Sequence, residues 1–206
     1  MSAEARPAAE ARLAAQLAFI AELDRMKSII RHTPLMDASR RETDAEHSWH
    51  VAVMALLLAE HADEPVDALR VAKMLLIHDV VEIDAGDTFI YDDKGNADKA
   101  EREGRAADRL FGLLPPDQGA AFRALWDEFE ARDSADARFA HAIDRFQPIM
   151  NNHLAGGGSW QANKVRPETV LRHSESRVAP ISRRLWGRLR AMIETSMGRG
   201  DFPKLD

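Results

Sequence analysis

The 206-residue sequence contains no cysteine, which excludes disulfide bonds, thiolate metal sites and cysteine nucleophiles. It has a single tyrosine, and aromatic residues make up only 6% of the chain. No hydrophobic run approaches the roughly 18 residues that a transmembrane helix needs. Residues 1–17 also lack the apolar core of a signal peptide. We therefore expect a cytoplasmic protein that has no membrane partner.

Charge of neither sign dominates the chain. The 28 basic and 34 acidic residues give a net charge of −6, so no general attraction draws the protein to polymeric nucleic acid. Hydrophobic residues form 45% of the chain and charged residues 30%, as in globular proteins. Because we find no internal repeat and no shift in composition, we expect one domain over residues 1–206.

Apolar residues recur at helical spacing, whereas sustained strand-like alternation is missing. Thr43 and Glu46 have the spacing of a capping box, which predicts a helix that begins near Asp44. Pro148 is expected to kink or end a later helix, and the glycines at 156–158 indicate a flexible joint. The other expected helices cover about residues 13–30, 65–82, 99–114, 122–130, 139–150 and 165–198. The sequence therefore predicts an all-α protein, a bundle of about six to eight helices.

Polar residues interrupt one strongly apolar run. His78 and Asp79 follow residues 74–77, which are all apolar, and precede Val80 and Val81. A buried charge is costly unless it is compensated, and a divalent cation held by imidazole and carboxylate groups would compensate it. Glu82 is four residues after His78 and would share its face on a continuous helix.

Two further polar residues lie on apolar faces elsewhere. His47 shares a helical face with Val51 and Met54, and Asp144 lies between Ile143 and Phe146. Either residue alone has an ordinary explanation. A buried histidine often bonds a backbone carbonyl, and an acid such as Asp144 can pair with a neighbouring basic residue. The case for a site therefore depends on the combination.

These motifs resemble those of the HD-domain phosphohydrolase superfamily, whose pattern is a histidine, a His-Asp pair and a distant aspartate. Here the pattern is carried by His47, by His78 and Asp79, and by Asp144. Together with Glu82 and Gly86-Asp87, it is similar to the 5′-deoxynucleotidase branch. The resemblance extends over about residues 20–152, followed by a C-terminal helical extension at about 165–198. It implies an HD-type helical bundle and a homodimer.

The resemblance also implies roles for individual residues. His47, His78, Asp79 and Asp144 would ligate one divalent ion, such as Mn²⁺, Co²⁺ or Mg²⁺. A metal-activated water would then remove the 5′-phosphate from deoxyribo- or ribonucleoside 5′-monophosphates. Glu82 would orient or deprotonate that water or assist the leaving group.

Substrate contacts follow from the same resemblance. Asp87 is expected to contact the sugar, and Arg31 and Arg41 are candidates for binding the phosphate. The family often places a tryptophan after the first arginine, but His32 follows Arg31 here. This departure leaves the nucleotide preference open.

Two alternatives remain at the level of sequence. The site could hydrolyse another small phosphate ester or a phosphodiester. The chain could also be a non-catalytic interaction module in which the metal only stabilises the helices. Glu82 and Asp87 argue against the second alternative, since neither is needed to hold a structural metal.

Overall fold

Helices make up most of the chain in this computed structural model, which describes residues 5–92 and 94–204. The all-α prediction is therefore confirmed. The helices of ten or more residues are α1 (Ala5–Leu23), α2 (Asp44–Leu58), α3 (Ala68–Ile77), α5 (Lys99–Phe111), α6 (Pro116–Ala131), α7 (Ala135–Leu154), α9 (Pro167–Val178) and α10 (Arg183–Arg199). The shorter elements are η1 (Asp24–Ser28), β1 (Ile30–Pro34), β2 (Arg41–Thr43), η2 (Ala59–His61), η3 (His78–Val81), α4 (Glu82–Ala85) and α8 (Gly158–Ala162).

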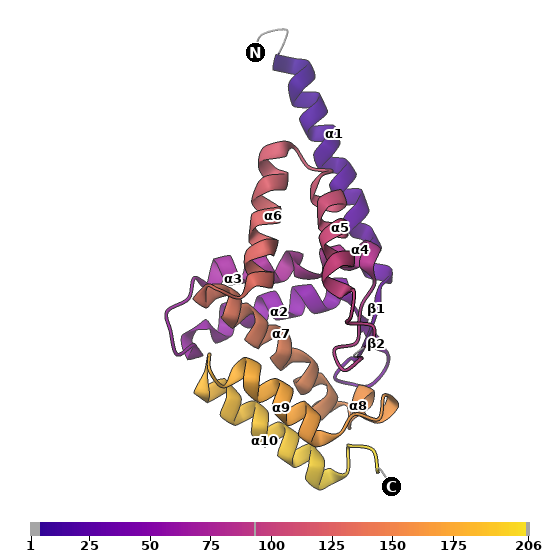
Figure 1. Ribbon diagram of the computed structural model, residues 1–206, viewed down its shortest axis with the longest axis vertical. Helices are drawn as coiled ribbons and strands as arrows, with labels where there is room; N and C mark the ends of the chain where they lie inside the picture. Colours follow the sequence, from indigo (N-terminus) through magenta and orange to yellow (C-terminus); the bar gives the residue numbers. More distant parts are fainter. Residues whose placement is uncertain (1–4, 93, 205–206) are drawn as a thin grey trace.

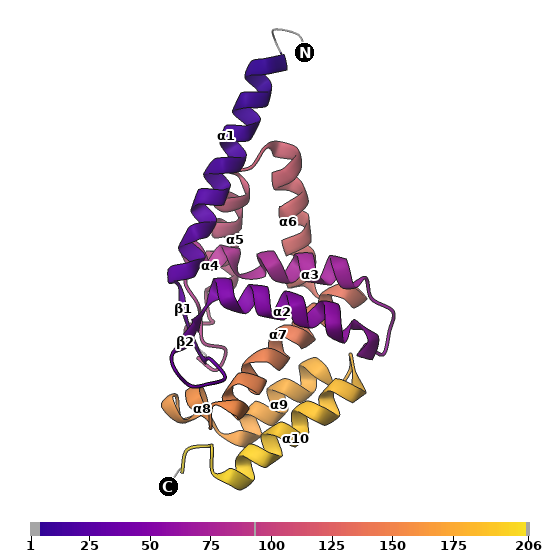
Figure 2. The ribbon, with the colours of Figure 1, turned by 180° about the vertical axis from the view of Figure 1, so that it is seen from behind.

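Helices α2 and α3 lie side by side across the middle of the molecule (Figure 1). Helix α7 packs against both of them and carries α9 and α10 on its other side. Helices α5 and α6 form a hairpin on the opposite side of α2 and α3, next to α1, whose N-terminal part extends beyond the other helices (Figure 2). No helix of the described chain is long and apolar enough to cross a membrane.

Buried apolar side chains form two clusters. The first joins α2, α3 and α7 to α9 and α10, and includes Leu75 and Phe129. The second joins α1, α5 and α6, and includes Val80 and Val81 of η3. The short turn η3 therefore lies where the two clusters meet, with its backbone fixed by apolar packing.

The predicted capping box begins α2. The Glu46 amide donates to Thr43 Oγ1 over 3.3 Å, and the Thr43 amide donates to a Glu46 carboxylate oxygen over 2.9 Å. These two bonds satisfy amides that a helix N-terminus leaves without partners. As a result, His47 lies in the first turn of α2, at the end nearest the hairpin of β1 and β2.

Several helix boundaries differ from the sequence predictions. Helix α3 begins at Ala68, where the Asp67 side chain accepts hydrogen bonds from two helical amides, and not at Pro65. It ends at Ile77, so His78 and Glu82 do not belong to one continuous helix. Helix α7 continues to Leu154, so Pro148 does not end it. The helix expected over residues 13–30 ends at Leu23.

A two-stranded antiparallel hairpin also appears in a chain whose strand signal is poor. Ile30 pairs with Thr43 and Pro34 with Arg41. The strands have only five and three residues, too few for an alternating pattern to stand out. The hairpin places Arg31 of β1 and Glu42 of β2 beside the first turn of α2.

The three glycines at 156–158 adopt defined conformations and do not form a loose joint. All three have positive φ, and the Gly157 amide donates to the Asn152 carbonyl over 2.8 Å. A Cβ on Gly157 would collide with the Asp201 carbonyl, whereas a Cβ on Gly156 would meet nothing within 4 Å. Gly157 is therefore needed where the C-terminal segment crosses the link between α7 and α8.

This close approach predicts unequal effects of alanine at neighbouring glycines. We expect Gly157→Ala to lower the free energy of unfolding by about 2 kcal/mol or more, because it adds a backbone collision to the strain of positive φ. Gly156→Ala carries only the strain, about 1 kcal/mol. Urea denaturation of both variants measures the difference, and equal losses would contradict the packing seen here.

Candidate metal centre

Three elements bring His47, His78 and Asp144 together. His47 lies on α2, His78 begins η3, and Asp144 lies on α7. One potential ligand atom from each residue lies within 4.8 Å of the other two. His47 Nε2 is 2.9 Å from Asp144 Oδ1, and His78 Nε2 is 3.7 Å from the same oxygen. The structure therefore gathers residues from three distant parts of the sequence.

The orientation of the His78 ring is fixed by a backbone bond. His78 Nδ1 donates to the Leu75 carbonyl over 2.8 Å, so Nε2 carries the lone pair. Nε2 is buried and makes no hydrogen bond, although Asp79 Oδ1 lies 3.2 Å away. Two groups that both offer electron pairs face each other here, and a cation between them would satisfy both.

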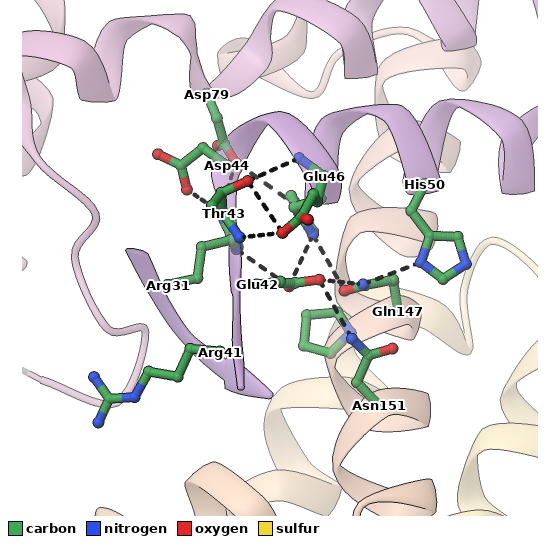
Figure 3. A network of polar contacts seen from close by, with 12 residues as sticks. Arg31, Arg41, Glu42, Thr43, Asp44, Glu46, His50, Asp79, Gln147 and Asn151 are labelled. Atoms are coloured by element: carbon green, nitrogen blue, oxygen red, sulfur yellow. Dashed lines mark hydrogen bonds and ion pairs between the residues drawn. The ribbon is translucent and has the colours of Figure 1, made fainter. Parts of the chain in front are cut away.

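His47 is oriented by a second layer of polar residues. The Gln147 amide nitrogen donates to Glu42 over 2.7 Å, which turns Gln147 Oε1 toward His47 Nδ1 at 3.1 Å. Because that oxygen only accepts, Nδ1 carries the proton and Nε2 faces Asp144 and Asp79. Asn151 also donates to Glu42, over 3.3 Å (Figure 3). Such an outer contact is typical of metal-ligating histidines.

The charges of this cluster depend on one another. Burial and Arg31 lower the pKa of His47, but contacts with Asp144, Glu42 and Asp79 outweigh them and raise it to about 9. Burial raises the pKa of Asp144, but the neighbouring His47 and His78 bring it well below its usual value. Without another cation, the site thus favours a proton on His47. Imidazole and carboxylate ligands suit a divalent ion, which would replace that proton, so the residues present fit a metal.

Asp79 reaches the same cluster from the turn η3. Asp79 Oδ1 lies 3.2 Å from His78 Nε2, and Asp79 Oδ2 lies 3.9 Å from His47 Nε2. The adjacent side chains of His78 and Asp79 therefore both offer ligand atoms to one site.

A second acidic group adjoins the first and surrounds Arg31. Asp44, Asp79 and Glu82 offer oxygens within 4.8 Å of one another. Arg31 Nη1 lies 2.6 Å from Asp79 Oδ2 and 3.2 Å from Asp44 Oδ1, and 4.0 Å from Glu82 Oε2. Figure 3 shows Arg31 pointing toward this group. Arg31 therefore offsets the negative charge that these buried side chains concentrate.

Crowding of carboxylates favours protons on this second group. Burial, with Asp79 and Asp44 nearby, raises the pKa of Glu82 well above its usual value. Burial and Asp79 also raise the pKa of Asp44, to about 7, against the opposing effect of Arg31. Arg31 alone thus does not compensate all three acids.

The predicted substrate residues fall into two sets. Arg31, Glu82 and Asp87 line one pocket together with the metal-cluster residues Asp79 and Asp144. Gly86, with φ of +75°, ends α4 and turns the chain into the loop that carries Asp87. Arg41 is exposed and points away from the cluster (Figure 3). The structure does not bring Arg41 to the other candidates.

Sequence reasoning missed several residues of the site. Glu42, Asp44 and Gln147 are fully or almost fully buried around the histidines. Lys99 lines the pocket, and its Nζ lies 3.4 Å from a carboxylate oxygen of buried Glu103. Burial lowers the pKa of Lys99, but the charges of Glu103, Glu82 and Asp79 have the larger effect and raise it. Asp44 was marked only by its position in the capping-box turn, and Lys99 only by the family resemblance of the segment around it.

Comparison with known proteins agrees with this geometry. The HD domain family model matches residues 23–186. A 5′-deoxynucleotidase of Bos taurus is 32% identical over 114 residues, 55% of this chain and 54% of that protein. The match therefore spans about half the length of that relative. A 5′-deoxynucleotidase of Yersinia pseudotuberculosis is 29% identical over 163 residues, 74% of this chain and 82% of that protein.

A solved structure extends the likeness to nearly the whole chain. The crystal structure of a predicted metal-dependent phosphohydrolase from Magnetospirillum magnetotacticum is 55% identical, with a TM-score of 0.87. The superposition covers 94% of this chain and 100% of that one. The histidine and aspartate cluster agrees with these matches, which establish that the chain belongs to the HD domain family.

Proposed function

We propose that this protein removes the 5′-phosphate from small nucleotides, with deoxyribonucleoside 5′-monophosphates as the expected class. The observation that carries the proposal is one pocket that combines Asp79 and Asp144 of the metal cluster with Glu82, Arg31 and Asp87. The names of the relatives from Bos taurus and Yersinia pseudotuberculosis support the same reaction.

In this proposal His47, His78, Asp79 and Asp144 hold one divalent ion. When bound, the ion supplies a Lewis acid that polarises the phosphate and lowers the pKa of a coordinated water. The chain's own task is to keep both imidazoles unprotonated on Nε2 and aimed at one point. The bonds from His78 to Leu75 and from His47 to Gln147 perform that task.

Glu82 is the proposed proton-transfer group. It is 4% exposed, and its Oε2 is buried without a hydrogen-bond partner. Such a carboxylate can accept a proton from the attacking water and return it to the leaving 5′-oxygen. Its position beside Asp79 supports this role, because both side chains line the same pocket.

The phosphate and the sugar need separate contacts. Arg31 presents its guanidinium at the pocket beside Asp79, and its planar fork suits a phosphate. Lys99 lines the same pocket and adds a second positive charge. Asp87 is the proposed acceptor for a sugar hydroxyl. In a deoxyribonucleotide 5′-monophosphate, the hydroxyl that donates to Asp87 would be the 3′-hydroxyl.

Ion binding gives the first test, which does not depend on activity. We expect Mn²⁺, Co²⁺ or Mg²⁺ to raise the thermal unfolding temperature of chelator-treated protein, at one ion per chain, because binding stabilises the folded state. His78→Ala should abolish the effect, since it removes a buried lone pair aimed at the site. His153→Ala changes a histidine at the far end of α7 and should preserve the effect. Undiminished ion binding by His78→Ala would contradict the assigned cluster.

Phosphate release tests the reaction itself. We expect ion-loaded protein to release phosphate from 5′-monophosphates faster than from 3′-monophosphates or from a diester such as bis(p-nitrophenyl) phosphate, and faster from deoxyribonucleotides than from ribonucleotides. Glu82→Gln should reduce the rate about 10²- to 10⁴-fold, as loss of a proton-transfer group does, with ion stoichiometry unchanged.

Each alternative predicts a different result in that assay. Preference for the diester would favour a phosphodiesterase. Ion binding without release from any ester, and no effect of Glu82→Gln, would favour a non-catalytic module. Either result would overturn the proposed reaction.

A matched pair of variants tests which arginine binds the phosphate. We expect Arg31→Lys to lower kcat/KM about tenfold or more, because lysine keeps the charge but loses the bidentate fork. Arg41→Lys should leave kcat/KM unchanged, since Arg41 is exposed outside the pocket. A larger loss of kcat/KM in Arg41→Lys than in Arg31→Lys would contradict this assignment, because it would identify Arg41 as the arginine that binds the phosphate.

The homodimer stays a prediction. Exposed apolar side chains on α1 and α2 are compatible with a second copy, among them Leu17, Ile20 and Leu57. Sedimentation velocity would decide it.

A further inference from the structure

Arg145 is a buried cation for which the structure offers no carboxylate. Its side chain is 8% exposed, and its Nε is buried without a hydrogen-bond partner. Within residues 5–92 and 94–204, no acidic oxygen lies within 4.0 Å of its guanidinium. Asp144 precedes it directly but points at His47 and His78. A charge buried in this way is normally paired, because desolvation without compensation costs several kcal/mol.

The nearby arginines add positive charge around Arg145. Burial lowers the pKa of the nearby Arg177, and Arg132 and Arg145 lower it further. Tyr91 is the polar neighbour: burial raises the pKa of Tyr91, while the charge of Arg145 and a hydrogen bond with it oppose that rise. A phenol group supplies a hydrogen bond but no net charge, so Tyr91 does not compensate Arg145.

Arg145 lines the same pocket as Asp79 and Asp144 of the metal cluster. Asp144 and Arg145 are consecutive on α7, so their side chains diverge by about 100° and reach different parts of that pocket. The part near Arg145 has aromatic walls. His32 stacks on Phe89 with ring centroids 4.7 Å apart, and Tyr91 contacts Phe89 edge-on at 5.3 Å.

We propose that Arg145 is a specificity-determining residue that binds an acceptor oxygen of the substrate away from the phosphate that is cleaved. The inference rests on the proposed function, because it concerns the far end of the same substrate. A guanidinium only donates hydrogen bonds, so it selects groups that accept them. Flat aromatic walls beside it suit a planar ring.

Two groups on a nucleotide offer such an oxygen. One is the ring carbonyl that thymine carries at C4 and guanine at C6. Cytosine and adenine carry an amino group at the same positions. The other is a second phosphate on the sugar. Both accept from a guanidinium, and the second also neutralises its charge.

The test compares Arg145→Gln and Arg145→Lys with Arg177→Gln. Arg177 is an exposed arginine near Arg145 that does not line the pocket, which makes it the matched control. The ion-loaded proteins are assayed with the 5′-monophosphates of the four common deoxynucleosides, with thymidine 3′,5′-bisphosphate and with phenyl phosphate, which has no base or sugar.

We expect Arg145→Gln to raise KM and lower kcat/KM about 10- to 100-fold for the preferred substrate, as loss of a hydrogen bond from a charged group does. The rate with phenyl phosphate should stay unchanged, and Arg145→Lys should lose less. Loss confined to the keto monophosphates identifies a base carbonyl. Loss confined to the bisphosphate identifies a second phosphate.

Binding by calorimetry to ion-loaded Glu82→Gln, with and without Arg145→Gln, separates the two proposals. Binding that depends on Arg145, without hydrolysis by the unmodified protein, would overturn only the proposed reaction. Hydrolysis with unchanged kinetics and binding in Arg145→Gln would overturn only this inference. Equal losses with phenyl phosphate would also overturn it, since they indicate a purely structural role. Absence of both hydrolysis and binding would overturn both.

Discussion

Compensation of buried charge is the constraint on which the rest of this structure depends. Several acids lie where two apolar clusters meet, and their charges cannot be left to solvent. Arg31, which lies on the hairpin, compensates part of this negative charge through contacts with Asp44 and Asp79. The two histidines compensate another part when they are protonated or when they share a bound cation with the acids. The short hairpin is therefore a structural component of the site, because it carries Arg31.

The elements that were predictable from sequence are those specified by neighbouring residues. Thr43 and Glu46 determine the start of α2 by two local hydrogen bonds, so four residues were sufficient to predict it. The His78-Asp79 pair stood out because charge within an apolar run needs compensation. The HD-type arrangement of His47 with these residues came from resemblance, since periodicity alone does not relate segments that are distant in sequence.

The remaining features depend on contacts between distant segments. Arg31 and Arg41 look equivalent in sequence, and only the hairpin places one inside and the other in solvent. Glu42 resembles a surface acid until β2 buries it against Gln147 of α7. The expected continuous helix ends at Ile77, and the 3₁₀ turn that follows buries Val80 and Val81 in the second apolar cluster.

Two arginines of the pocket show how the same residue type can have different roles. Arg31 lies among acids, so its charge is balanced before any substrate arrives. Arg145 lies beside Tyr91 and near Arg177, and it makes no ion pair with any carboxylate of the described residues. Because a buried charge without compensation destabilises the fold, Arg145 is unfavourable in the free protein and more favourable once an acceptor binds it. That difference favours substrates that carry such an acceptor over those that lack it, which is the physical basis of discrimination at a site whose chemistry acts only on the phosphate.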